Sequence, residues 1–266
     1  MMKLNAKTES LLYILLVLGG ALAVVRLRWY QLMMFLPTLV ALLMMLVIGR
    51  DGYSRTGWRR LGLHRSGVRA WPVAILLPAA ALGSGYLVAA AAGVAVYTPL
   101  EGFTRVGLML RYVLLVLIYT LSFSLGEEIG WRGYLLPRLM AFGRRKGYLI
   151  GGLAWACFHY PAMFFTDLYL PDGNRLLNAV VFTLMVLALN VVLGELRLAS
   201  GSVWTASLLH SAHNAFVETV GIGFRVSAPA GHYLVGETSV VTLAFYGLAA
   251  VWLLARSRTG TAPAAG

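Results

Sequence analysis

The chain has 266 residues, of which 59% are hydrophobic and only 12% are charged, with a mean hydropathy of +0.77. Soluble domains carry about a quarter charged residues, so this composition excludes a single aqueous domain and predicts a polytopic membrane protein. The formal charge of +12 does not indicate nucleic-acid binding, because the basic residues stand in short intervals between apolar segments. The single cysteine, Cys157, excludes an intramolecular disulfide and a multi-cysteine metal site.

Apolar segments follow one another along the whole chain. In lipid, backbone polar groups must bond within their own segment, so we expect helices and not the alternating strands of a barrel. The predicted fold is all-α, a polytopic bundle of about eight transmembrane helices. It forms one domain over residues 1–258, with a motif-bearing core at about 107–221 and a disordered tail at 259–266. The segments run over about 10–27, 30–49, 71–97, 107–136, 148–166, 176–194, 201–221 and 238–255.

Basic residues in the intervals predict the orientation. With the N-terminus in the cytoplasm, fifteen Lys and Arg residues fall on the cytoplasmic side and six on the other. Both termini are therefore expected inside, in a cell membrane that the Ala- and Arg-rich composition suggests is a bacterial inner membrane. The polar interval from Gly52 to Arg69 is expected to lie on the inner membrane surface, where its arginines meet anionic headgroups.

Three of the apolar segments carry polar residues that an inert bundle does not need. The fourth contains the adjacent pair Glu127 and Glu128 with Arg132 one turn later, and each costs roughly 2.5–3.5 kcal/mol to insert into a membrane. The fifth contains His159. The seventh contains His210, His213 and Asn214. Because inserting these charged residues is costly, the sequence predicts a functional site inside the membrane.

Helical spacing sorts these residues by face. Glu128 and Arg132 are four apart and are expected to pair, whereas Glu127 is turned by about 100° and is left to face a cavity. His210 and Asn214 are also four apart, so both are expected to point at one place, with His213 off that line. Counted from the predicted cytoplasmic ends, Glu127, His159 and His210 all lie roughly 14–16 Å deep.

Water-dependent hydrolysis is the chemistry that fits this set. A carboxylate in an apolar site is a better general base near neutral pH. A nearby histidine helps to position or deprotonate the water, and a histidine and an asparagine on another helix donate hydrogen bonds to an oxyanion. No activated serine or cysteine nucleophile is evident.

The motifs resemble the CPBP family, which comprises type II CAAX prenyl endopeptidases and bacterial Abi or bacteriocin-processing relatives. The resemblance covers about 125–215 and rests on E-E-x-x-x-R (Glu127, Glu128, Arg132), aromatic-x-x-x-H ending at His159, and H-x-x-x-N (His210, Asn214). Trp155 stands where the family usually has Phe, and we expect it to fill a packing role that leaves the chemistry intact.

The resemblance implies an intramembrane endopeptidase that cleaves a membrane-associated protein or peptide near the cytoplasmic leaflet. It implies that Glu127 activates water with help from His159, that His210 and Asn214 form the oxyanion hole, and that Glu128 and Arg132 hold the site. It commits to no cofactor. A divalent metal such as zinc stays open, with Glu127, His159 and His210 as its ligands, although the chain lacks H-E-x-x-H.

Three other interpretations remain open from the sequence. The carboxylates and Arg132 form a structural ion-pair cluster, or they act as a relay in a proton-coupled transporter, or the chain is a non-catalytic immunity or accessory protein. The transporter lacks sequence support, because no internal repeat with matching interrupted helices is evident.

Overall fold

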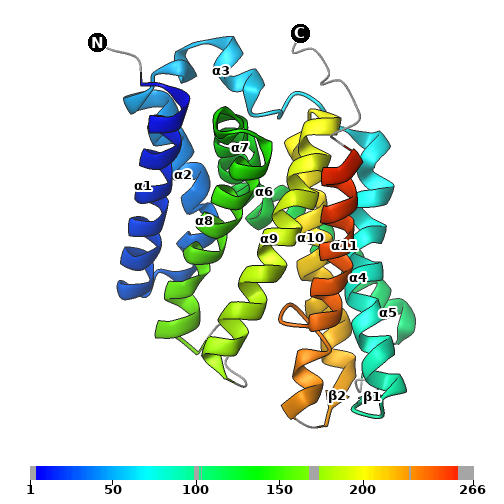
Figure 1. Cartoon of the computed structure of the whole chain (residues 1–266). Helices are drawn as coiled ribbons and strands as arrows, with labels where there is room; N and C mark the ends of the chain where they lie inside the picture. The colour runs from blue at the N-terminus through cyan, green and yellow to red at the C-terminus, as the bar shows by residue number, and fades with distance from the viewer. Residues whose placement is uncertain (1–3, 99–101, 103, 168–173, 228, 257–266) are drawn as a thin grey trace.

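The computed structural model describes residues 4–98, 102, 104–167, 174–227 and 229–256, and this part of the chain is almost entirely helical (Figure 1). The all-α prediction is confirmed. The predicted tail at 259–266 lies outside the described residues, and the single domain over 1–258 stays a prediction.

The first half of the chain contributes helices to two opposite sides of the bundle. Asn5 caps the first helix by accepting a hydrogen bond from the amide of Thr8 at 2.9 Å. The second segment is irregular, because a 3₁₀ turn precedes its α-helical centre and a π turn follows it. The elements are α1 (Ala6–Arg26), the 3₁₀ turn Tyr30–Phe35, α2 (Leu36–Leu43), the π turn Met44–Ile48, the 3₁₀ turn Asp51–Tyr53, α3 (Arg55–Arg60), the 3₁₀ turn Val68–Ala70, α4 (Trp71–Ala91) and β1 (Ala95–Tyr97).

The second half carries the predicted motifs. Its elements are α5 (Arg105–Leu121), α6 (Phe123–Glu128), the π-helical segment Ile129–Leu135, α7 (Leu136–Leu139), the 3₁₀ turn Met140–Phe142, α8 (Arg144–Phe165), α9 (Arg175–Ser200), α10 (Val203–Val220), the 3₁₀ turn Gly221–Gly223, β2 (Phe224–Val226), the 3₁₀ turn Pro229–Tyr233 and α11 (Val240–Arg256). Helix α9 packs against α8, α10 and α11, and α10 also contacts α4 and α5.

Each of the eight apolar segments corresponds to a helix or a chain of short helices. Five of these are long and apolar enough to cross a membrane, namely Ala6–Arg26, Tyr30–Ile48, Val68–Ala91, Arg105–Phe142 and Arg175–Ser200. The count of eight spans therefore stays a prediction. The third segment was expected to reach residue 97, but its helix ends at Ala91. Ala95–Tyr97 instead pairs antiparallel with Phe224–Val226.

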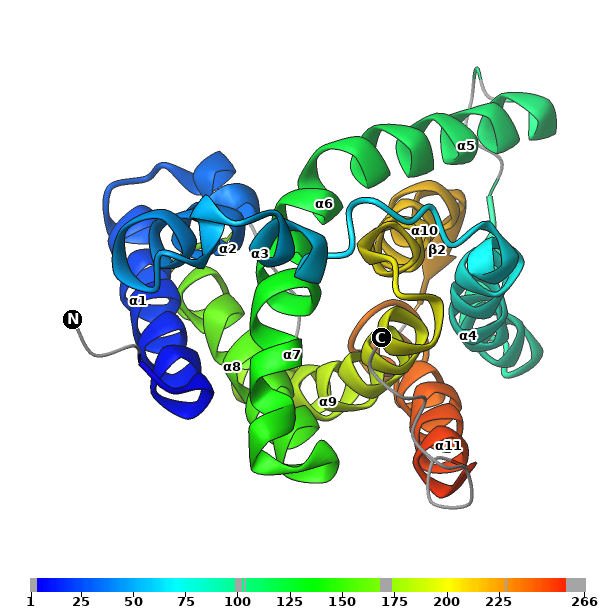
Figure 2. The same cartoon turned by 90° about the horizontal axis from the view of Figure 1, so that it is seen from above.

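The fourth segment was expected to run as one stretch over 107–136, and this is wrong. The backbone of Ser122 leaves the helical region, with φ −131° and ψ −91°, so α5 and α6 are separate helices. Figure 2 shows α5 at the outside of the bundle, beside α10. Its side chains are mostly exposed apolar groups, including Met109, Leu110 and Leu117, which suits a helix that faces lipid.

The ends of the described chain lie at the same end of the bundle. The start of α1, the end of α11 and the short helix α3 are together there (Figure 1). The interval from Arg50 to Arg69 and the turn between α7 and α8 also belong to this end, which we call the basic end. The loops that the charge count grouped together thus share one end.

Candidate active site

The carboxylate pair lies where α6 passes into the π-helical segment. Glycines on this stretch let it pack very closely against the first two helices. A Cβ on Gly130 would lie 2.5 Å from the backbone of Pro37, and one on Gly126 would lie 2.6 Å from the carbonyl oxygen of Met34. The wider π turn begins directly after Glu128. Close packing on one side turns the carboxylates toward α8, α9 and α10 on the other.

Two side chains, Arg132 and His210, hold Glu128, and the helical spacing predicted the contact with Arg132. Oε1 of Glu128 accepts hydrogen bonds from Arg132 Nη1 at 2.7 Å and from Nδ1 of His210 at 2.9 Å. Arg132 also donates from Nη2 to Oδ1 of Asn190 at 3.1 Å, so the ion pair is anchored to α9. Glu128 and Arg132 are 0% and 1% exposed. Asn190 and His210 bond further atoms of this buried ion pair, whereas Glu128 Oε2 and Arg132 Nε have no hydrogen-bond partner in the described part of the chain.

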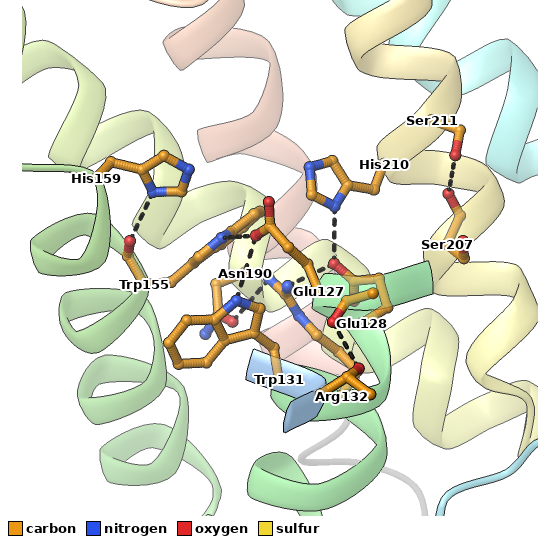
Figure 3. A network of polar contacts seen from close by, with 12 residues as sticks. Glu127, Glu128, Trp131, Arg132, Trp155, His159, Asn190, Ser207, His210 and Ser211 are labelled. Atoms are coloured by element: carbon orange, nitrogen blue, oxygen red, sulfur yellow. Dashed lines mark hydrogen bonds and ion pairs between the residues drawn. The ribbon is translucent and has the colours of Figure 1, made fainter. Parts of the chain in front are cut away.

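Glu127 takes a different environment, as the helical phase predicted. Its Oε2 accepts hydrogen bonds from two indoles, Nε1 of Trp155 at 3.0 Å and Nε1 of Trp131 at 3.3 Å. In Figure 3 its carboxylate points into the space between His159 and His210. The two donors are neutral, so they orient the carboxylate without cancelling its charge. The expectation that Trp155 only fills space is wrong, because its indole N–H contacts Glu127 and its ring lies 3.9 Å from the guanidinium of Arg132.

Hydrogen bonds define which nitrogen of each histidine carries a proton. Nδ1 of His159 lies 2.8 Å from the carbonyl oxygen of Trp155, and a carbonyl only accepts, so Nδ1 carries the proton. The basic nitrogen of the neutral His159 ring is then Nε2. Nδ1 of His210 donates to Glu128 in the same way. An oxyanion-binding role for His210 therefore needs the doubly protonated ring, which the Glu128 carboxylate favours.

The predicted site residues line one cavity of about 210 Å³. Glu127, His159, His210 and Asn214 all contribute to its wall, from α6, α8 and α10. The structure therefore brings together the four residues that the sequence singled out, and their catalytic roles stay predictions. The remaining wall is largely apolar and comes from the start of the second segment, α8 and α9.

Two further ionisable residues of the cavity wall were not assigned a role from the sequence. Glu237 precedes α11, outside every motif, and no spacing signal pointed to it. His213 was expected off the line of His210 and Asn214. It lines the cavity but its Nδ1 is bonded to the hydroxyl of Tyr246 at 3.0 Å, which ties α10 to α11. Trp131 was also missed, although it stands four residues after Glu127, the same spacing that identified Arg132.

The fit of a metal ion is limited by the partners that these residues already have. Among the described residues, no group of three or more His, Cys, Asp and Glu side chains is arranged to hold a metal ion. Glu127 Oε2 accepts from two indoles, and both histidines use Nδ1 in other bonds. The three ligands considered from the sequence therefore do not form a ready metal site in this arrangement.

The cavity extends away from the basic end. Tyr30, Thr166 and Glu237 complete its wall, and they lie where α1 ends, where α8 ends and where α11 begins. A second, wider cavity shares Tyr30 and Thr166 and adds Arg26, Arg28 and Asp167. The cavity that contains Glu127 thus adjoins a second cavity at the end of the bundle opposite α3.

The structure thus combines helices that are long and apolar enough to cross a membrane with a buried cluster of carboxylates and histidines. Residues 108–216 match the family model described as Type II CAAX prenyl endopeptidase Rce1-like. This segment, 109 of the 266 residues, is similar to that family and holds every predicted site residue. The resemblance drawn from the motifs is confirmed. A comparison with curated proteins finds no match for the chain.

Proposed function

We propose that the protein is an intramembrane endopeptidase in which Glu127 activates a water molecule to hydrolyse a peptide bond. The observation that carries the proposal is that the two adjacent carboxylates have different partners. Glu128 is neutralised by Arg132 and His210, whereas Glu127 receives only neutral donors and faces the cavity. A purely structural ion-pair cluster would not need a second carboxylate that stays outside the ion pair and faces a cavity.

The reaction follows from the positions of the side chains. Glu127 takes a proton from water, and the water oxygen attacks the carbonyl carbon of the scissile bond. His159, with its basic Nε2, helps to hold and deprotonate that water. The tetrahedral oxyanion accepts hydrogen bonds from the Nε2–H of His210 and from the amide of Asn214. The proton then passes from Glu127 to the leaving nitrogen, the C–N bond breaks, and a carboxylate and an amine are released.

The fixed ion pair prepares the oxyanion hole before substrate arrives. Glu128 holds the ring of His210 by Nδ1, and Arg132 with Asn190 holds Glu128. Donors that are already oriented stabilise developing charge without reorganising at the moment of reaction. The low polarity of the surrounding wall strengthens each of these interactions.

We propose a route without a metal ion, in which Glu127 itself activates the water. A metal-dependent route predicts a different outcome in a direct test. Purified protein dialysed against a chelator is expected to keep its activity. Loss of activity on dialysis, with recovery on adding zinc, would show that the proposed mechanism is wrong.

The substrate is a membrane-associated protein or peptide that enters from the end opposite the basic loops. With those loops in the cytoplasm, this differs from the expectation of cleavage near the cytoplasmic leaflet. The cavity wall supports the change, since it runs toward Tyr30 and Thr166 and not toward α3. We place the protein in a bacterial inner membrane with both termini cytoplasmic.

A proteomic comparison tests the proposal and identifies the substrate. Membranes containing the wild type are compared with membranes containing Glu127→Gln at matched expression. We expect at least one membrane peptide to accumulate uncut in the variant, with its cleaved form lost. The matched control is Glu218→Gln, a carboxylate outside the cavity that accepts from Tyr119, and it is expected to process like the wild type. Identical peptide patterns for all three proteins contradict the proposal.

A further inference from the structure

A second polar cavity lies at the basic end, away from the candidate active site. It has a volume of about 640 Å³ and is formed by the loop that precedes α4 and by the last turn of α9. Its lining residues are His64, Arg65, Ser66, Gly67, Val68, Arg69, Ala70, Ala199 and Ser200.

Three arginines place positive charge in and behind this cavity. Arg65 and Arg69 line it, and Arg197 lies below the loop with only 6% of its surface exposed. Arg197 donates from Nη2 to the carbonyl oxygen of Arg60 at 2.8 Å, but its buried Nε has no hydrogen-bond partner. Arg65 is close enough to Arg197 for the two charges to repel one another. Such a group of like charges is costly unless an anion offsets it.

Hydrogen bonds hold the loop that precedes α4 in place, so Arg65 and Arg69 have fixed positions on it. Trp204 Nε1 donates to the carbonyl oxygen of Leu63 at 2.9 Å, and the hydroxyl of Ser202 donates to the carbonyl oxygen of Arg65. Two glycines with positive φ bring the backbones together. A Cβ on Gly62 would lie 2.6 Å from Arg197 Nη2, and one on Gly201 would lie 2.8 Å from Arg65 Nη1.

No protein carboxylate balances this charge in the described part of the chain. None of the salt bridges there includes Arg65, Arg69 or Arg197. The acidic groups of the basic end are engaged elsewhere, since Glu9 and Asp51 both pair with Arg138 and Glu195 pairs with Arg144. The carboxyl end of α9 offers about half a negative charge, which does not offset three arginines.

We propose that this cavity binds the phosphate of an anionic phospholipid headgroup. Arg65 and Arg69 donate to the phosphate oxygens from the loop, and Arg197 supports the site from below. We name a lipid as the source of the phosphate because exposed apolar side chains lie beside the cavity. Val68 and Trp71 are 55% and 41% exposed beside it, and exposed Trp residues next to basic side chains mark the interfacial zone.

Binding of single lipids by native mass spectrometry tests the proposal. Delipidated full-length protein in detergent is titrated with phosphatidylglycerol or with phosphatidylcholine, and inorganic phosphate is added in a separate arm. We expect one phosphatidylglycerol to bind preferentially, and the double variant R65Q/R69Q to bind it at least about tenfold more weakly. The matched control R55Q/R59Q removes two exposed arginines of the same polar interval and is expected to bind within about threefold of wild type.

A second variant keeps the proposal falsifiable if the double variant does not fold. Ala199→Glu places a carboxylate in the cavity wall, so it is expected to raise the thermal midpoint without lipid and to abolish preferential binding. Equal weakening by R55Q/R59Q would show that attraction is non-specific and overturn the site. Displacement of the lipid by millimolar inorganic phosphate would overturn the assignment to a lipid. Lipid binding is measured without any cleavage reaction, so the result does not depend on whether the protein is a protease.

Discussion

Trp155 contacts both halves of the carboxylate pair. Its indole N–H donates to Glu127 at 3.0 Å, and the face of its ring covers the Arg132 guanidinium. A hydrogen bond to a charged group contributes about 1.5–3 kcal/mol, and a cation over a tryptophan ring adds about 1–2 kcal/mol when desolvated. One side chain on α8 therefore orients the proposed base and shields the ion pair beside it.

We expect Trp155→Phe to separate these two contacts. Phenylalanine keeps a ring over Arg132 but has no N–H for Glu127, so kcat is expected to fall about tenfold or more while KM stays the same. The measurement is steady-state cleavage of the peptide identified by the proteomic comparison. Trp252→Phe, which changes an exposed residue of α11, is the control. An unchanged kcat in Trp155→Phe would argue against a role for the indole N–H.

The sequence predicts the local contacts of the site better than its distant ones. The pairing of Glu128 with Arg132 followed from a spacing of four residues, and so did the common direction of His210 and Asn214. The bonds from Trp155 to Glu127 and from His210 to Glu128 join residues 28 and 82 positions apart. Such contacts depend on how α6, α8 and α10 pack, which helical periodicity alone does not define.

The stretch from α6 to α7 is the element on which the site depends. Gly126 and Gly130 face the first two apolar segments, and Glu127 faces the cavity. One hydroxyl bond joins the stretch to α2, and another joins α1 to α2. Thr38 donates to the carbonyl oxygen of Gly126 at 2.6 Å, and Tyr13 donates to that of Pro37 at 3.0 Å. These bonds satisfy backbone groups at a place where the helical pattern changes.

Gly130→Ala is expected to destabilise this element. The added Cβ would lie 2.4 Å from the hydroxyl of Tyr13 and 2.5 Å from the backbone of Pro37. We expect a loss of about 1–3 kcal/mol and a lower thermal midpoint in detergent. The control is Gly19→Ala on α1, where the added Cβ would have no atom within 4 Å. It is expected to leave the stability unchanged or to raise it slightly. Equal midpoints for the two variants would contradict the close packing of this stretch.

The positions of the helices were largely predictable, whereas their interruptions were not. Apolar periodicity located all eight segments, because each helix buries or exposes a long run of similar side chains. The break at Ser122 and the π turn after Glu128 lie on either side of α6, and α6 and the π-helical segment both pack against α2. The short strands at residues 95–97 and 224–226 pair residues that are 127 to 131 positions apart, beyond the reach of a local pattern.

The two ends of the molecule carry different proposed sites. The basic end carries α3, the loop before α4 and the proposed lipid site, while the cavity that contains Glu127 leads to the other end. A positive surface at one end fits an anionic leaflet. The proposed orientation thus places the lipid site in the cytoplasmic leaflet and the entry route on the far side.

Cysteine labelling of intact cells tests this orientation. In a Cys157→Ser background, Asp167→Cys reports on the entry end, where Asp167 is 86% exposed, and Arg59→Cys reports on α3. A membrane-impermeant maleimide is expected to label the first in intact cells and the second only after permeabilisation. The reverse pattern would return the entry route to the cytoplasmic side.

The central claim is that Glu127 is the base for hydrolysis inside this bundle. The most direct measurement follows cleavage of the identified peptide by purified protein in proteoliposomes, comparing wild type, Glu127→Gln and Glu218→Gln. The proposed mechanism predicts that wild type and Glu218→Gln cleave at equal rates and that Glu127→Gln, still folded, is slower by at least about a thousandfold. Cleavage by Glu127→Gln at the wild-type rate would contradict it.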